Sequence, residues 1–114
     1  MLYQIELPYP PTMNTYWRHW NGRTVLARRG RQYKEIVQAI VGPVPPHLTG
    51  PLEFEAEVWL PDRRRRDIDN ILKPLLDALT SAGVWEDDSQ VKSLKVVHAG
   101  VQKPGCVKIC VGST

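Results

Sequence analysis

The feature that most constrains the fold is residues 52–60, in which apolar side chains occupy every second position. Three of the four positions between them are glutamate. Successive side chains of a β-strand point to opposite faces, so this alternation predicts a strand with one covered face and one solvated face. The covered face comprises Leu52, Phe54, Ala56, Val58 and Leu60. The chain must therefore build a sheet that is packed on one side.

Four further strands are predicted from alternation, β-branched residues and flanking turn residues, at 2–7, 23–26, 91–99 and 107–111. In the first, Tyr3, Ile5 and Leu7 face the core, and Pro8 ends the strand because proline cannot donate to a sheet ladder. The last two are joined by the turn-like segment 102–105. We expect them to pair as an antiparallel hairpin.

Two segments have helical spacing. Residues 32–41 carry apolar side chains at 33, 36, 37, 40 and 41, and Gly42 ends that helix. The second helix has an apolar stripe of Ile71, Leu72, Leu75, Leu76 and Leu79. Proline is tolerated only in the first turn of a helix, so Pro74 predicts a start near residues 70–71, or else a kink. Gly83 lies near the expected end.

The order of these elements predicts an α+β fold: a single small domain over residues 1–114, with a mixed β-sheet and two main helices. A chain of 114 residues is too short for a separate nucleotide-binding domain, and its scattered glycines form no phosphate loop, so no nucleotide cofactor is expected. No apolar run approaches the roughly 18 residues that span a membrane. Two cysteines do not suggest a disulfide scaffold, and we expect a cytoplasmic protein without membrane contact.

The formal net charge of +3 conceals a pattern. Residues 1–52 carry six basic and two acidic side chains, residues 53–91 five basic and ten acidic, and residues 92–114 four basic and none acidic. An acidic centre between basic flanks suggests a polyanion held around a metal-binding core. A mixed, solvated surface would give the same pattern.

Carboxylates gather just after the alternating strand. If the chain is still extended there, Asp67 and Asp69 point to the same side and suit Mg²⁺, a hard ion that prefers oxygen ligands. Asp87 and Asp88 offer a third carboxylate beyond the second helix. Adjacent residues in an extended segment face opposite ways, so only one of that pair is expected to join. The spacing does not choose between them.

A lysine follows the first two carboxylates. Lys73 lies one helical turn after Asp69 and could hold a phosphate or stabilise charge that develops during hydrolysis. Asp77, four residues further on, offers a structural alternative. Asp69, Lys73 and Asp77 could form an ordinary ion-pair ladder on a solvated helix face.

Four consecutive arginines precede the carboxylates: Arg63, Arg64, Arg65 and Arg66. In an extended run at least two should project together, and guanidinium groups bind phosphates well. We expect this run to contact a nucleic-acid backbone, although it could simply neutralise nearby aspartates. Arg23 adds basic surface beside an aromatic loop at 12–21, where interleaved arginine and aromatic side chains suit phosphate binding and base stacking. A core edge or a dimer contact would explain the same aromatics.

A zinc site fails on geometry. Cys106 and Cys110 lie in a predicted strand and are about 13 Å apart, so they can share neither a zinc ion nor a disulfide with each other. His98 would have been the third ligand. We expect both cysteines to be free thiols or small buried residues.

Residues 62–91 read DRRRRDIDNILKPLLDALTSAGVWEDDSQV. This block resembles the RusA family of Holliday junction resolvases. The segments LPYPPTMNTYWRH and GRTVLARRGRQYKEIV resemble the opening parts of the same family, so the likeness runs from about Tyr3 to Val111. The resemblance implies a RusA-like fold.

The resemblance also implies a function. Family members are homodimers that use Mg²⁺, for which Mn²⁺ is the expected substitute, to resolve four-way branched DNA by paired symmetric nicks. Carried over, Asp67, Asp69 and Asp88 are the catalytic, metal-binding carboxylates, and Lys73 is the catalytic lysine. The family match thus selects Asp88 over Asp87. It further suggests a bacterial cell, with a phage or prophage as the source of the gene.

Two departures and two alternatives remain. Pro74, directly after the lysine, and the proline-rich linker 42–51 depart from the family pattern. The alternatives to junction resolution are a Mg²⁺-dependent nuclease for other branched DNA and a non-catalytic module that binds junctions. In the second case the acidic cluster is only an ion-pair network.

Overall fold

The computed structural model describes residues 2–12, 17–20, 23–26 and 28–114, with 17–20 and 23–26 described by their backbone alone. The main sheet has four strands: β1 (Tyr3–Pro8), β4 (Leu52–Leu60), β5 (Val91–Val101) and β6 (Cys106–Ser113). Their order is β1-β6-β4-β5. β6 is antiparallel to both of its neighbours, whereas β5 is parallel to β4. The expected mixed sheet of an α+β fold is confirmed.

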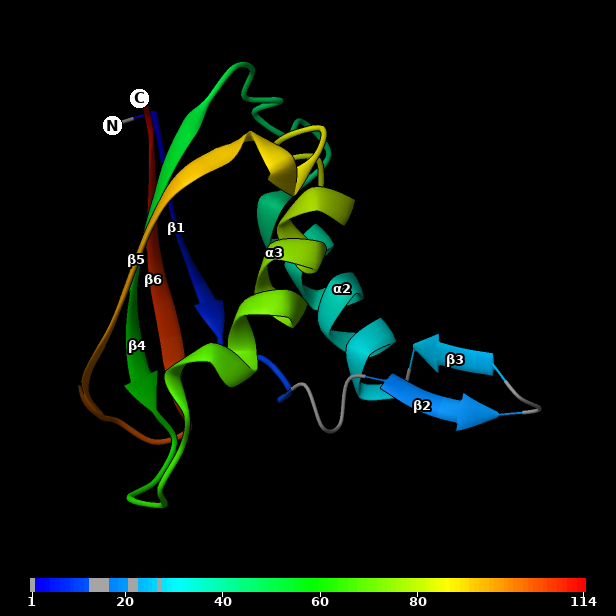
Figure 1. Cartoon of the computed structure of the whole chain (residues 1–114), viewed down its shortest axis with the longest axis vertical. Helices are drawn as coiled ribbons and strands as arrows, with labels where there is room; N and C mark the ends of the chain where they lie inside the picture. Colours follow the sequence, from blue (N-terminus) through cyan, green and yellow to red (C-terminus); the bar gives the residue numbers. More distant parts are fainter. Residues whose placement is uncertain (1, 13–16, 21–22, 27) are drawn as a thin grey trace.

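Two helices, α2 (Arg28–Val41) and α3 (Leu72–Ser81), pack side by side on one face of this sheet (Figure 1). The alternation of β4 sets that face. Leu52, Phe54, Ala56 and Val58 are buried, and the three glutamates between them are exposed. A small hairpin of β2 (Trp17–Trp20) and β3 (Arg23–Leu26) projects beyond the start of α2. In the described part of the chain, no helix covers the other face of the sheet.

The expected hairpin of the last two strands is wrong. β5 and β6 do not pair, because β6 passes to the other side of β4 and lies between β4 and β1. Its side chains Val107, Ile109 and Val111 are each at most 1% exposed. β6, whose inward side chains are almost completely buried, therefore lies inside the sheet. β5 is an edge strand, and its side chains are half-buried or exposed.

Two other expectations need correction. Residues 17–20, which were expected within a loop, form β2. The helix expected at 32–41 begins at Arg28, because its first turn carries exposed arginines that add no apolar periodicity. The strand at 23–26 is confirmed, as is a helix end at Gly42, where φ is +89°.

The second helix begins where Pro74 requires. A short 3-10 helix, η1 (Ile68–Ile71), leads into α3, so Pro74 is the third residue of α3 and lies in its first turn. A second 3-10 helix, η2 (Asp88–Gln90), follows α3 and leads into β5. Trp85, just before η2, is buried and packs edge-on against Phe54, with ring centroids 6.1 Å apart. The core thus ties the acidic connection after α3 to the sheet.

Candidate active site

The arginine-rich loop between β4 and η1 is organised by Asp62. Its carboxylate accepts hydrogen bonds from the Arg64 backbone N–H at 3.0 Å and from Arg66 Nη2 at 2.8 Å and Nε at 3.3 Å. The Arg66 guanidinium also lies over the Tyr9 ring, 5.6 Å from its centroid. The hydrogen bond from Arg66, followed by that from Arg64, lowers the pKa of Asp62. The Arg66 side chain therefore makes the closest contact that holds the loop together, and Arg64 Nε lies 3.9 Å from the same carboxylate.

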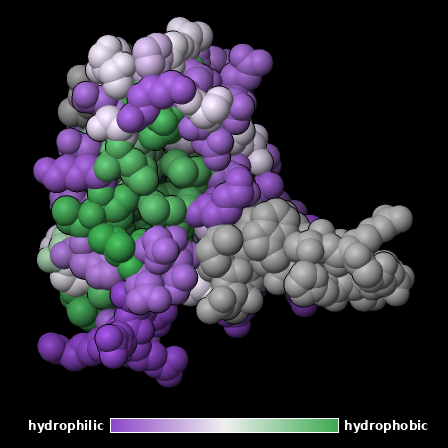
Figure 2. Space-filling model, in the orientation of Figure 1, coloured by the Kyte–Doolittle hydropathy of each residue, from purple (hydrophilic) through white to green (hydrophobic). Residues whose placement is uncertain are grey.

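The other three arginines of the run, Arg63, Arg64 and Arg65, are exposed, and the Arg64 side chain is 84% accessible. Figure 2 shows hydrophilic side chains gathered at the lower end of the molecule, where this loop lies. The side chain of Arg23 falls outside the described part of the structure, so its expected DNA contact stays a prediction.

Asp67 heads η1 without capping it. The residue occupies the N-cap position with an extended backbone, φ −78° and ψ 137°, yet its carboxylate makes no capping hydrogen bond. An N-cap aspartate ordinarily accepts from the first backbone N–H groups of its helix. The Asp67 carboxylate is exposed, with no cap to hold it. It is thus available to an outside ligand.

Asp69 is not in the extended backbone on which its expected alignment with Asp67 depended. It lies inside η1, where side chains three apart, rather than two apart, share a side. Asn70 accordingly takes the position beside Asp67. Both line an open cavity of about 400 Å³ together with Tyr9, Thr12, Arg65 and Arg66.

Lys73 forms an ion pair with Asp77 of its own helix, α3, rather than with Asp69. Its Nζ lies 2.9 Å from Asp77 Oδ1, and its side chain is 49% exposed. The hydrogen bond and charge of Asp77 raise the pKa of Lys73, and the charges of Asp88 and Asp87 add to this effect. Half of the suggested ion-pair ladder is therefore present. The same ammonium lies within electrostatic reach of the acidic turn after α3.

Asp87 and Asp88 have different structural roles. Asp87 is the N-cap of η2, and its carboxylate accepts from the Ser89 hydroxyl at 3.0 Å and the Ser89 N–H at 3.5 Å. The hydrogen bonds of Ser89 lower the pKa of Asp87. Asp88 is the first residue of η2 and is half-buried. Capping occupies Asp87, which favours Asp88 as the residue that serves a site.

Within one chain the described residues do not close a metal site. No group of three or more His, Cys, Asp or Glu side chains among residues 2–12 and 28–114 lies close enough to hold an ion. Cys106 and Cys110 are free thiols on β6, as expected. In the same described part, no helix is long and apolar enough to cross a membrane.

Two residues near the candidate site were missed from the sequence. Gln90 completes a capping box with Asp87, and the Asp-x-x-Gln spacing could have revealed it. Tyr9 lies between prolines, and no local pattern pointed to its contact with Arg66. Such a contact joins positions 57 residues apart and depends on the fold.

Comparisons with known proteins agree with the sequence resemblance. Residues 8–111 match the family model described as Endodeoxyribonuclease RusA. The chain is 41% identical over 111 residues to the Crossover junction endodeoxyribonuclease RusA of Escherichia coli strain K12, covering 96% of this chain and 92% of that protein. It is 42% identical over 105 residues to the protein of the same name from Enterobacteria phage HK97, covering 90% and 87%.

Proposed function

Because the chain belongs to the RusA family of endodeoxyribonucleases, we propose that it resolves Holliday junctions by hydrolysing phosphodiester bonds in DNA. The observation that carries this proposal is the near full-length match to crossover junction endodeoxyribonucleases. The proposal assigns catalysis to Asp67, Asp69, Asp88 and Lys73.

The donor types suit a hard cation, although among the described residues no three carboxylates of one chain lie close enough together to hold one. Asp67 carries a carboxylate that is not used in capping, and Asp69 and Asp88 offer two more carboxylates. Mg²⁺ is commonly held by one or two carboxylates, with water and substrate phosphate as its other ligands. In this proposal Asp67, Asp69 and Asp88 hold Mg²⁺, and Mn²⁺ can replace it. When bound, the ion would lower the pKa of a water and stabilise charge on the scissile phosphate.

The side chains of the chain supply orientation and further charge. The pKa of Lys73 is raised by Asp77, so Lys73 is protonated at neutral pH and can stabilise negative charge on the phosphate. The Asp62–Arg66 pair fixes the loop that carries the exposed arginines. Arg63, Arg64 and Arg65 then bind backbone phosphates and bring the DNA to the carboxylates.

A homodimer completes the proposal, because paired symmetric nicks need two sites related by a two-fold axis. The structure offers apolar surface that a second copy could cover. Leu94 pairs laterally with buried Phe54, on the helix side of the sheet, yet it is 47% exposed because β5 is an edge strand. Ile68 of η1 is 40% exposed. Sedimentation velocity should give the mass of two chains and, for Leu94→Glu, a shift toward one.

One substrate panel tests the activity. A four-way junction, a flap, a three-way branch and a linear duplex are each incubated at equal concentration with Mg²⁺ or with a chelator. We expect symmetric paired nicks in the four-way junction with Mg²⁺ only. Preferred cutting of the flap or three-way branch would favour the broader branched-DNA nuclease. Tight junction binding without Mg²⁺-dependent cutting would favour the non-catalytic module.

The cellular location and the source of the gene are inferred from the DNA substrate and from the relatives. Relatives of the same name occur in Escherichia coli and in the phages 82 and HK97. We place the protein in the bacterial cytoplasm, where a prophage or phage gene would supply it for DNA recombination and repair.

A further inference from the structure

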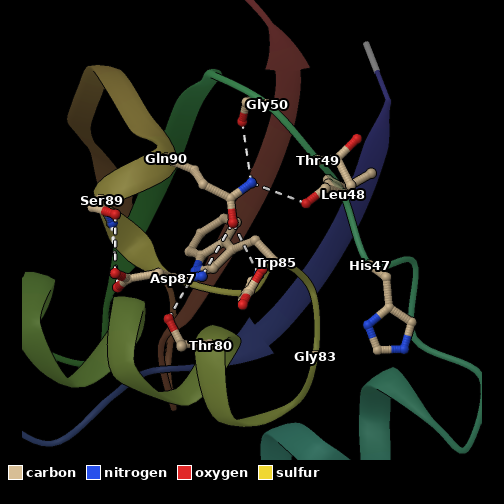
Figure 3. Close-up of a pocket in the computed structure, with 11 residues that line it drawn as sticks. His47, Leu48, Thr49, Gly50, Thr80, Gly83, Trp85, Asp87, Ser89 and Gln90 are labelled. Atoms are coloured by element: carbon tan, nitrogen blue, oxygen red, sulfur yellow. Dashed lines mark hydrogen bonds between the residues drawn. The ribbon is translucent and has the colours of Figure 1, made fainter.

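The side-chain amide of Gln90 makes four hydrogen bonds, the full capacity of the group. Its carbonyl oxygen accepts from the backbone N–H groups of Glu86 at 3.0 Å and Asp87 at 3.1 Å. Its amide nitrogen donates to the backbone carbonyls of Leu48 at 3.0 Å and Gly50 at 3.1 Å. Figure 3 shows the amide between these two segments. An amide can accept two bonds and donate two, so none of its capacity is left over.

The four bonds join segments that lie about 40 residues apart in the chain. One is the acidic turn 86–90, and the other is the proline-rich linker 42–51. The linker already runs along the end of α3, where the N–H groups of His47 and Leu48 donate to the carbonyls of Gly83 and Val84 at 3.1 and 2.8 Å. Through its side-chain hydrogen bonds, Gln90 connects this anchored linker to the turn that carries Asp88.

No side chain of the acidic turn 86–90 is fully buried. Glu86, Asp87 and Ser89 are exposed, and the turn borders an open cavity of about 740 Å³. Apolar packing stops at Trp85, which is buried, and resumes at Val91, which packs against the core. Between these two residues the backbone is held by hydrogen bonds, and among the described residues those of Gln90 are the ones that reach another segment.

We propose that Gln90 is a positioning residue that fixes the backbone of the acidic turn, and with it Asp88, for metal binding. This inference rests on the proposed function. Asp88 lies between Asp87, whose N–H donates to the Gln90 side chain, and Gln90 itself. Residues that orient metal ligands commonly change metal affinity or activity by about 10- to 100-fold when they are replaced. The linker 42–51 thereby acts as the support against which the turn is held.

The first test needs neither metal nor DNA. Amide hydrogen exchange is measured on the metal-free full chain for Gln90→Ala and, as a matched control, Gln38→Ala. Gln38 makes one side-chain bond, to the Ser81 carbonyl at 3.3 Å. We expect exchange at Glu86 and Asp87 to quicken by at least about tenfold in Gln90→Ala only, since their acceptor is lost. Unchanged exchange at both amides would overturn the proposal.

The second test titrates Mg²⁺ in the cleavage assay. For Gln90→Ala we expect the half-maximal Mg²⁺ concentration to rise by about tenfold, with near wild-type rate at saturation and unchanged junction binding in chelator. A midpoint equal to that of wild type, with a lower rate at every Mg²⁺ concentration, would show a merely structural role. Gln90→Glu, which keeps the acceptors for the turn, should shift the midpoint less and replaces Gln90→Ala if that variant does not fold. If wild type cuts no junction, the proposed function fails, while the exchange experiment still tests the positioning.

Discussion

The described part of the chain contains two short 3-10 helices, each headed by an aspartate with an extended backbone, and the two aspartates behave differently. Asp87 caps η2, and Gln90 closes the reciprocal half of a capping box. Asp67 occupies the same position before η1 and makes no cap. One turn therefore satisfies its own backbone with its carboxylate, and the other leaves its carboxylate exposed.

The difference teaches how to separate structural from functional carboxylates in one chain. A cap stabilises a helix end by satisfying N–H groups that otherwise have no partner. Asp67 does not stabilise η1 in this way. Instead, it lines a cavity together with Arg65 and Arg66. An aspartate in a capping position without a capping bond is consistent with a role in binding.

The substitution Asp67→Asn should have the largest effect of those that test the contrast between the two aspartates. We expect cleavage of a four-way junction to fall by about 10³-fold, the factor for several kcal/mol of lost transition-state stabilisation. Junction binding should persist, because removing a carboxylate lowers repulsion toward phosphate. The melting temperature should not change, since no cap is lost. Undiminished cleavage would remove Asp67 from the catalytic group.

A smaller effect is expected at Asp77, which holds Lys73. In Asp77→Asn the ammonium loses its partner, and cleavage should fall by about tenfold, as for other residues that orient a reacting group. The raised pKa of Lys73 means that its ion pair is complete below 10.5 and is lost only as pH rises through the higher, folded value. A rate profile from pH 8 to 11 should decline at lower pH in Asp77→Asn than in wild type. Coinciding profiles would contradict a role for Asp77 in holding this charge.

Much of the fold could be predicted because its signals are local. The alternation of residues 52–60 identified a strand and its buried face, and Pro74 placed the start of a helix to within two residues. The neighbours of the last strand could not be predicted in this way. A hairpin and a crossover have the same local sequence, and the choice depends on which strand buries its face between two others.

The candidate site shows the same contrast between local signals, which could be predicted, and contacts that depend on the fold, which could not. Residue type and spacing identified Asp67, Asp69, Lys73 and the acidic pair, and the family resemblance chose Asp88. The spacing suggested a ladder in which Lys73 pairs with both Asp69 and Asp77. It could not show that only the Asp77 pair would form, because that depends on where the 3-10 helix gives way to the α-helix. Sequence spacing indicates which groups are near one another, and backbone geometry decides which of them meet.

The substitution Asp87→Ala tests the second aspartate, which caps η2. Removing the cap should lower the melting temperature, whereas cleavage should fall by less than about tenfold, because the turn keeps its bonds to Gln90. The pKa of Asp87 is lowered by Ser89, so the contribution of the cap is present above the ordinary value of 3.8 and is lost as pH falls through the folded value. Melting curves from pH 2.5 to 7 for both proteins should converge at the acid end. A loss of cleavage as large as that in Asp67→Asn would assign Asp87 to the catalytic group.

The smallest effects separate the arginines of the loop that precedes η1. Arg64→Ala should weaken junction binding by about threefold and reduce the salt slope of log K by about 0.9, the change for one phosphate contact. Arg66→Ala should do more than this, because it also takes from Asp62 the partner that fixes the loop, and the exposed arginines then bind with more conformational freedom. Binding isotherms at four salt concentrations, in chelator, measure both slopes. Asp62→Asn is the matched control, since it loosens the loop without removing a positive charge. If it weakens binding with an unchanged slope, Arg66 acts by organising the loop, and if binding is unaffected, Arg66 acts only through its charge.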